Sequence, residues 1–220
     1  MLVKDFINKD IPVLNVCDTA EYALSLMDDW KLKQLPVATQ TGLFQGLVDE
    51  KRLLELSQPT SSIEEVGRLD VSIGRDQSLH EAMHLLVQYG LTLLPVVTSE
   101  GYYLGAVTQE GLLRGLTEWI GADREGSVIV LDVDAKDYSL VELARLVESN
   151  NAHVLSVLTQ VDPDTGRYHV ALKIDLVDAS PVLRCFERFH YAVSFYFMEH
   201  GMVDEQLRCR MSELLYYMNM

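Results

Sequence analysis

The chain has 220 residues, 48% of them hydrophobic, so it can form one or two domains that each bury their own core. Its formal net charge of −15 argues against nucleic acid as a partner, because an acidic surface repels phosphate backbones. Three distant cysteines without a C-x-x-C pair argue against a disulfide framework or a thiolate zinc site. With no apolar run long enough for a signal peptide or a membrane span, we expect a cytoplasmic protein with no membrane partner.

An internal repeat organises the first half of the chain. Residues 14–56, moved by 59 positions, fall on residues 73–115 without a gap. The coincident positions include Leu35-Pro36-Val37 with Leu94-Pro95-Val96, Gly42 with Gly101, and Gly46 with Gly105. Matches at one offset that include proline and glycine indicate a duplication.

Each copy predicts the same order of elements, β-α-β-β-α. The first helix shows apolar residues at helical spacing, and the Leu-Pro-Val triplet begins a buried strand, where proline costs no necessary ladder bond. The expected boundaries are first strands at 13–16 and 71–73, helix N-caps at Asp18 or Thr19 and at Ser78, and second-strand ends at Val48 and Val107. A closing helix follows in each copy.

This pattern resembles a tandem pair of CBS domains. The segments G-L-V-D-E-K-R-L at 46–53 and G-A-V-T-Q-E-G-L at 105–112 match the closing signature of that family, and residues 3–7 resemble its lead-in helix. The resemblance implies two repeats, at 1–58 and 59–121, packed face to face. It also implies clefts between them that bind adenosine-containing ligands such as AMP, ATP or S-adenosylmethionine.

The two clefts differ in the residues that this family uses for nucleotides. Binders in the family place Ser or Thr at the end of the last strand, next to a helix N-terminus that suits phosphate, and Asp three residues later for the ribose. Copy one has Asp49 and Arg52 there, and the Asp49 carboxylate would repel phosphate. Copy two has Thr108 and Gly111, so neither copy keeps the ribose-binding Asp.

Copy two is therefore the better candidate for a ligand site. The resemblance assigns to it Arg75, Ser78, Thr92, Leu93, Gly105, Val107 and Thr108. A degenerate, purely structural pair is the alternative.

Residues 80–84 contain the zinc-protease pattern H-E-x-x-H, with His80 and His84 on one helix face. The repeat argues against a metal site, because the same helix in copy one, at residues 21–25, has no histidine. The apolar positions from Leu79 to Leu86 form the core face of this helix, which leaves both histidines outward. We therefore expect two exposed histidines and no metal.

A polar segment with two glycines, residues 120–126, precedes a second pattern, β-α-β-β-α-β over 126–198. The expected strands are 128–133, 154–161, 168–174 and 192–197. The first helix begins with a capping box of Ser139 and Glu142 and buries Leu140, Leu143, Ala144 and Val147. The second helix has Ser180 as its N-cap and Pro181 at its first position, and runs to about His190.

This order resembles an ACT domain, a ferredoxin-like module that often binds amino acids at dimer interfaces. That family usually has Gly where Tyr138 stands and Asn where His153 stands, so dimerisation is favoured here over amino-acid binding. A free sheet edge also favours pairing with a second copy. The order CBS–CBS–ACT resembles the acetoin-utilisation family of bacterial regulators.

The tail, residues 199–220, has apolar residues near helical spacing. They are Val203, Leu207, Met211, Leu214, Leu215 and Met218. We predict a helix that packs on its own protein or on a dimer mate, and a docking helix for another protein is the alternative.

Together these features predict a non-catalytic regulatory homodimer that senses an adenosine-containing ligand. No Ser-His-Asp set, P-loop, G-x-G-x-x-G motif or carboxylate cluster supports an enzyme. The alternative is a ligand-free scaffold for dimerisation or for an unknown protein partner, which the missing ribose Asp favours.

Overall fold

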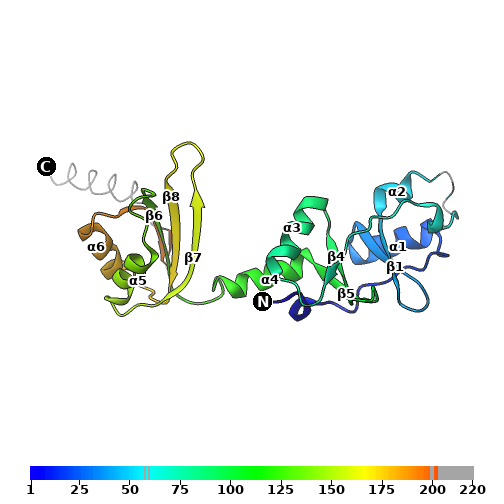
Figure 1. The fold of residues 1–220 in the computed structure, drawn as a ribbon, viewed down its shortest axis with the longest axis horizontal. Helices are drawn as coiled ribbons and strands as arrows, with labels where there is room; N and C mark the ends of the chain where they lie inside the picture. The colour runs from blue at the N-terminus through cyan, green and yellow to red at the C-terminus, as the bar shows by residue number, and fades with distance from the viewer. Residues whose placement is uncertain (57, 59, 199–200, 203–220) are drawn as a thin grey trace. The chain divides into compact units, whose positions relative to one another are not determined.

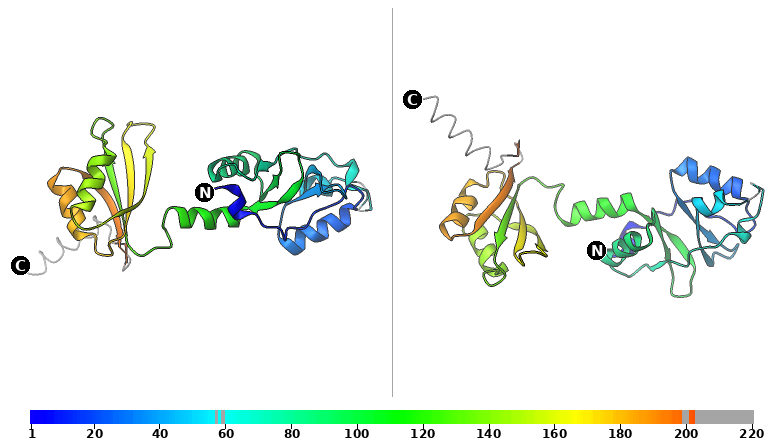
Figure 2. Two further views of the ribbon diagram at one scale, coloured as in Figure 1. Left: turned by 60° about the horizontal axis from the view of Figure 1, so that its bottom comes forward. Right: turned by 90° about the horizontal axis from the view of Figure 1, so that it is seen from above.

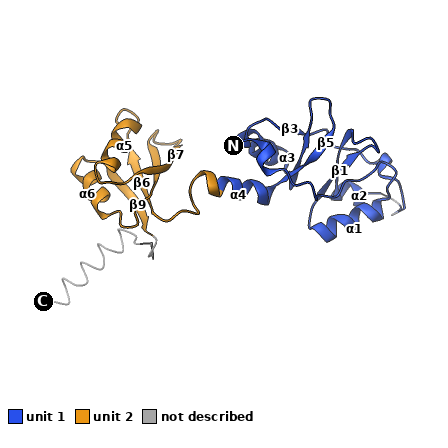
Figure 3. Cartoon of the chain, turned by 90° about the horizontal axis from the view of Figure 1, so that it is seen from below, with its two compact units in different colours: residues 1–116 blue, residues 117–220 orange. Residues whose placement is uncertain are grey.

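The computed structural model describes residues 1–56, 58, 60–198 and 201–202 (Figures 1 and 2). The chain divides into unit 1, Met1–Leu116, and unit 2, Thr117–Met220 (Figure 3). Among the helices in these described stretches, none is both long and apolar enough to traverse a bilayer.

Unit 1 contains the two repeats, and its elements follow the predicted order. They are η1 (Val3–Phe6), α1 (Ala20–Trp30), β1 (Gln34–Ala38), β2 (Phe44–Asp49), α2 (Glu50–Leu54), η2 (Ile63–Glu65), β3 (Ile73–Gly74), α3 (Leu79–Tyr89), β4 (Leu93–Val97), β5 (Tyr103–Thr108) and α4 (Gln109–Trp119), the last of which runs into unit 2. The lead-in segment, predicted as a helix, is a single 3-10 turn, η1.

Strand register confirms the offset of 59 residues. Leu35 pairs with Val48 in repeat 1, and Leu94 pairs with Val107 in repeat 2, each in an antiparallel hairpin. The first strands are shorter than predicted: repeat 1 has one parallel bridge at Leu14, and β3 has two residues. The Thr19 and Ser78 side chains cap α1 and α3 as predicted, because each accepts a backbone N–H three residues on.

The segments that precede the repeats are exchanged between them. The η1 segment packs on repeat 2, where the Val3 N–H donates to the Gln77 carbonyl and Asn8 pairs with Ala106. The η2 segment packs on repeat 1, where Leu69 pairs with Leu47. Neither repeat therefore completes its sheet with its own lead-in segment.

One hydrophobic core joins the two repeats. Side chains from both repeats, among them Leu35, Leu47, Leu94 and Val107, are fully buried in it. The hairpin turns also meet, because Leu43 forms a bridge with Tyr102. The repeats thus bury their apolar faces against each other, which is the arrangement that the duplicated pattern predicts.

Unit 2 has the predicted order β-α-β-β-α-β. Its elements are β6 (Ser127–Val133), α5 (Leu140–Glu148), β7 (Val154–Val161), β8 (Tyr168–Ile174), α6 (Ser180–Arg188), β9 (Ala192–Met198) and an added strand β10 (Gly201–Met202). The antiparallel sheet has the order β10-β9-β6-β8-β7, and α5 and α6 lie on the same face of it (Figure 1). A second core fills the space between sheet and helices.

Three details of unit 2 differ from the prediction. Leu140 is 45% exposed, and Leu146, six residues further on, is buried in its place. The N-cap of α6 is Ala179, and the Asp178 carboxylate accepts the Ser180 N–H. The Glu142 carboxylate accepts two hydrogen bonds from Arg145, while its own N–H binds the Ser139 hydroxyl. The predicted tail helix falls in residues 199–220. Of these, the structure describes only Gly201–Met202, which form the strand β10.

Candidate ligand cleft

Four of the predicted site residues come together where β4, β5 and α4 meet. Leu93 is the strand partner of Thr108, and Val107 is the partner of the next residue along β4. The Thr92 carbonyl accepts a hydrogen bond from the N–H of Gln109, the first residue of α4. This junction therefore places a threonine hydroxyl and a helix N-terminus beside buried apolar strands.

The Thr108 hydroxyl caps α4. Its Oγ1 accepts a hydrogen bond of 3.1 Å from the Gly111 N–H, which satisfies one of the free donors at the helix start. A hydroxyl that accepts one hydrogen bond still has a proton to donate. Thr108 can therefore bind an anion without losing its role as a cap.

Gln34, which the sequence analysis did not single out, links the two repeats at this junction. Its side chain is only 4% exposed, and its Oε1 accepts both the Thr92 N–H (2.9 Å) and the Thr92 hydroxyl (2.7 Å). Its Nε2 donates to the Asp49 carboxylate at 2.7 Å. The backbone N–H and C=O of Thr92, a predicted site residue, both have partners within the protein.

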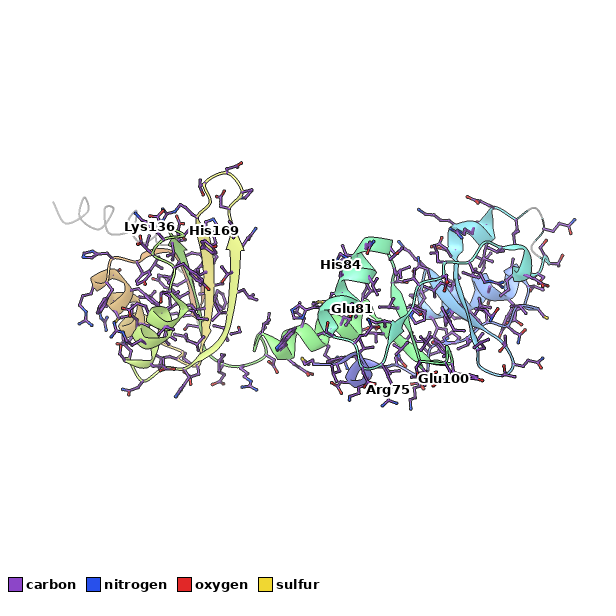
Figure 4. The ribbon with its side chains drawn as sticks, in the orientation of Figure 1. Arg75, Glu81, His84, Glu100, Lys136 and His169 are labelled. Carbon is purple, nitrogen blue, oxygen red and sulfur yellow. The ribbon has the colours of Figure 1, made fainter. Side chains whose placement is uncertain are left out.

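Arg75 and Ser78 lie at the other end of β4. Gly74 pairs with Val97, whereas Thr108 pairs with Leu93, four strand residues or roughly 13 Å away. The Ser78 hydroxyl caps α3, and the Arg75 side chain is 55% exposed and 3.9 Å from the Asp76 carboxylate (Figure 4). The structure therefore divides the predicted site residues into two groups.

The Gly105 backbone is in close contact with the lead-in segment. Its φ is +142°, and a Cβ there would lie 2.5 Å from Ile7 Cγ2 and 2.7 Å from the Asn8 carbonyl oxygen. The close approach that glycine permits is therefore taken by the exchanged lead-in segment. The assignment of Gly105 to a ligand site stays a prediction beside this contact with the protein's own chain.

In repeat 1, the equivalent junction is closed by its own side chains. The Asp49 carboxylate caps α2 by accepting the Lys51 N–H at 2.9 Å, and it also accepts from Gln34. The Arg52 guanidinium donates a hydrogen bond to the Gly67 carbonyl. This bond occupies the side chain that could otherwise bind a phosphate. Repeat 2 thus keeps the more favourable junction for an anion.

Comparison with known proteins identifies the fold of unit 1. The sequence profile of the CBS domain matches residues 63–118. A crystal structure of a CBS domain pair/ACT domain protein from Thermotoga maritima has 28% sequence identity and a TM-score of 0.50. The match covers 54% of this chain and 98% of that chain. Unit 1 has the fold of a CBS domain pair.

Three enzymes also show similarity over about half of this chain. Homoserine O-acetyltransferase of Methanosarcina acetivorans is 25% identical over 114 residues, 51% of this chain and 21% of the enzyme. Inosine-5'-monophosphate dehydrogenase of Methanocaldococcus jannaschii is 23% identical over 124 residues, 56% and 25% of the two chains. The A-adding tRNA nucleotidyltransferase of Aquifex aeolicus is 29% identical over 119 residues, 53% and 14%. The chain spans a quarter or less of the length of these relatives.

The H-E-x-x-H residues lie on the outer face of α3 in the CBS pair. His80 and His84 are exposed, and Leu79, Ala82 and Leu86 are buried in the core. Figure 4 labels His84 and Glu81 on this helix. The Glu81 carboxylate accepts a hydrogen bond from Gln77. Among the described residues, no group of three His, Cys, Asp or Glu side chains is placed to hold a metal ion.

Unit 2, beyond the CBS pair, contains a polar cavity of about 510 Å³. Arg167 crosses it and donates to Asp132 at 2.6 Å and to Asp134 at 2.7 Å, and the Asp132 hydrogen bond raises the pKa of Arg167. At the rim, the hydrogen bond from Arg145 lowers the pKa of Glu142. Asp132, Asp134 and Glu142 are thus each paired with an arginine, and Asp137 also lines the cavity.

Tyr138 and His153, which stand where an ACT domain usually has Gly and Asn, are both engaged within unit 2. The Tyr138 ring stacks on Tyr168 with centroids 5.0 Å apart. The His153 imidazole contacts the Asp175 carboxylate at 2.8 Å. These contacts give both residues a structural role.

Proposed function

We propose that this chain is a non-catalytic regulator that senses an adenosine-containing ligand at the β4–β5–α4 junction of its CBS pair. The observation that carries the proposal is the position of Thr108, whose hydroxyl caps α4 beside the buried strand residues Leu93 and Val107. An 11-residue helix carries a partial positive charge at its start, which favours an anion there.

Regulation would follow if the ligand favours one arrangement of the two repeats. The junction involves both repeats, because Gln34 of repeat 1 holds Thr92 of repeat 2. A ligand that takes the Thr92 N–H must displace Gln34, and it then changes the contact between the repeats. A ligand shifts such an equilibrium only by its difference in affinity for the two states.

Isothermal titration calorimetry of the full chain with AMP, ATP and S-adenosylmethionine tests this function. We expect heat with at least one of these compounds. The Thr108→Val variant should then bind about tenfold more weakly, a loss of about 1.4 kcal/mol, and Thr108→Ser should retain the affinity. No heat from any of the three compounds with the wild-type chain would refute the proposal.

Arg75→Ala distinguishes two positions for the ligand. An unchanged affinity places the ligand at the Thr108 end of β4 alone. A tenfold loss means that the ligand extends along β4 to Arg75, so that both predicted groups belong to one site.

The second candidate function is a scaffold that binds no ligand. Two observations favour a scaffold. Gly111 stands in place of the ribose-binding Asp, and the Thr92 backbone already has partners within the protein. Native mass spectrometry of freshly purified protein separates the two functions. A co-purified adenosine compound indicates a sensor. A measured mass equal to that of the protein without any bound compound indicates a scaffold.

We further propose that unit 2 is an ACT-like dimerisation module and that the protein is a cytoplasmic homodimer related to the acetoin-utilisation regulators. The order of elements in unit 2 and the sheet order β9-β6-β8-β7 support the ACT-like assignment. Light scattering of the full chain measures its mass, and the mass of a single chain would overturn the dimer.

A further inference from the structure

The closing helices of the two repeats, α2 and α4, each turn one leucine inward and the next one outward. At the inward position, Leu53 is 2% exposed and its equivalent Leu112 is 3% exposed, both in the shared core. At the outward position, Leu54 is 65% exposed and its equivalent Leu113 is 64% exposed. A single exposed leucine is ordinary, but among residues 50–56 only these two leucines are identical to their equivalents. The repeats therefore share one exposed apolar position on these helices.

The charged residues beside the exposed leucines stand in opposite order in the two repeats. Lys51 precedes Leu54 by three residues on α2, and the C-cap Glu55 follows it. The equivalent residues on α4 are Glu110 and Arg114, and all four charged residues are exposed. Because residues three and four apart share a helix face, each leucine lies beside one acid and one base. The two repeats thus keep the leucine and exchange the positions of the charges.

These two faces do not cover each other within one chain. The helices α2 and α4 lie at separate ends of unit 1 (Figures 1 and 3), and the exposed fractions show that neither leucine is covered by the other. On α4, the Arg114 guanidinium is 3.3 Å from the Glu110 carboxylate, with side chains 72% and 84% exposed. A surface ion pair of this kind contributes little stability, so both side chains can take other partners at little cost.

We propose that unit 1 associates head to tail with unit 1 of a second copy, so that α2 of each copy lies against α4 of the other. The two helices run side by side in the same direction, with Leu54 of one copy in contact with Leu113 of the other. Lys51 then meets Glu110 of the second copy, and Glu55 meets its Arg114. A two-fold axis repeats the contact between α4 of the first copy and α2 of the second. Opposite charges that face each other across an interface fix its orientation.

Pairing of each helix with its own copy accounts for less of the pattern. Two α2 helices in opposite directions also bring Lys51 to Glu55, but this contact sets no condition on the charges of α4. Contact between α2 and α4 requires reversed charges at both equivalent positions, and both are reversed. The contact uses a different surface from the pairing proposed for unit 2 and does not depend on it.

Cysteine cross-linking between two variants of the full chain identifies which helices meet. Both variants carry Cys17→Ser and Cys209→Ser, and Cys185 is retained because it is buried. One variant then carries Leu54→Cys and the other Leu113→Cys, and the two are mixed, allowed to exchange subunits and treated with a short bismaleimide. We expect a covalent dimer in the mixture and none from either variant alone.

The matched control mixes Leu54→Cys with Val87→Cys, a position that is 83% exposed on α3. We expect no covalent dimer from this mixture. A covalent dimer from Leu54→Cys alone would show that α2 pairs with its own copy, and it would overturn the proposal. An absence of cross-linking between Leu54→Cys and Leu113→Cys, or an equal yield in the control mixture, would overturn it as well.

Exchange of the charges tests the orientation without cysteines. The variant with Lys51→Glu and Glu55→Lys keeps the net charge and gives α2 the charge order of α4. We expect its dimer dissociation constant, measured by sedimentation velocity at low salt, to rise about tenfold. Adding Glu110→Lys and Arg114→Glu should restore the wild-type value, because the order is then reversed again. Contact between two antiparallel α2 helices would be unaffected by the first exchange, so an unchanged constant would overturn the proposal.

The same measurement separates this contact from the pairing proposed for unit 2. A wild-type dimer whose dissociation constant ignores the charge exchange leaves the unit 2 pairing in place and overturns only the contact between α2 and α4. A wild-type chain that stays a monomer at every concentration overturns both.

Discussion

Gln34 is a buried amide whose partners all belong to the junction between the repeats. Replacing it with alanine would leave the Thr92 N–H and hydroxyl and the Asp49 carboxylate without this partner. We predict that Gln34→Ala lowers the free energy of unfolding by roughly 2–4 kcal/mol, because each buried group left unsatisfied costs about 1–3 kcal/mol. Urea denaturation of the full chain measures the change.

The matched control for Gln34 is Gln88→Ala on the exposed side of α3. This change should cost less than about 0.5 kcal/mol, as most surface substitutions do. Equal losses in the two variants would mean that the network around Gln34 adds nothing to stability.

Asp175 gives unit 2 a pH dependence. The His153 N–H and then the His153 side chain bind its carboxylate, and these hydrogen bonds lower the pKa of Asp175. A lowered carboxylate pKa stabilises the fold above the unfolded value of about 3.9, and this contribution is lost as the pH falls through the folded value. We predict that Asp175→Asn lowers the urea midpoint at pH 7, and that the difference from wild type shrinks below about pH 4.

The exposed Asp123 provides the comparison for this titration. Asp123→Asn should leave the urea midpoint close to the wild-type value at both pH values. A difference between Asp175→Asn and wild type that stays constant from pH 7 to pH 3 would contradict the assigned role of the carboxylate.

At the level of elements, the exchanged lead-in segment depends on Gly105. A Cβ at this position meets the Ile7 side chain and the Asn8 backbone, and its φ of +142° disfavours other residues. We predict that Gly105→Ala lowers the free energy of unfolding by about 3 kcal/mol, from backbone strain and displacement of the segment. Gly90→Ala, where φ is +62° and nothing lies within 4 Å, should cost only about 1 kcal/mol.

Hydrogen exchange locates the effect of this substitution. The Ala106 N–H donates to the Asn8 carbonyl, so it should lose protection in Gly105→Ala and keep it in Gly90→Ala. If both variants lose the same stability and keep this protection, the lead-in segment does not depend on Gly105.

Elements that carry their own local signal were predictable from sequence. The N-caps Thr19 and Ser78 and the strand that begins near Pro95 are set by side-chain chemistry within a few residues. The exchange of lead-in segments was not predictable, because Asn8 and Ala106 are distant in sequence and neither residue type specifies a partner. For the same reason, the pairing of Gln34 with Thr92 had no sequence signal beyond a polar residue at the start of a buried strand.

The candidate site shows the same limit. The duplicated pattern placed Thr108 at a helix start, which the structure confirms. The resemblance grouped Arg75 with Thr108 because both belong to the second repeat. The parallel pairing of β3 with β4 places Arg75 at the opposite end of the sheet, and strand direction cannot be derived from the residues of a two-residue strand.

At the scale of the whole molecule, the two duplicated repeats share one hydrophobic core. Each repeat has a small sheet and leaves an apolar face that only the other repeat covers, and each borrows its edge segment from before the other repeat. Unit 1 should therefore fold as a single cooperative body, and neither repeat should fold alone.

Two fragments test this cooperativity. We predict that residues 1–121 give a dispersed amide spectrum and one urea transition, because they contain the full core and both exchanged segments. Residues 1–59 should give the spectrum of an unfolded chain, because Leu35 and Leu47 would lose their partners from repeat 2 and the edge segment around Leu69 would be missing. A dispersed spectrum from residues 1–59 would mean that a single repeat is an independent folding unit, and the shared core would then be a docking interface between two stable halves.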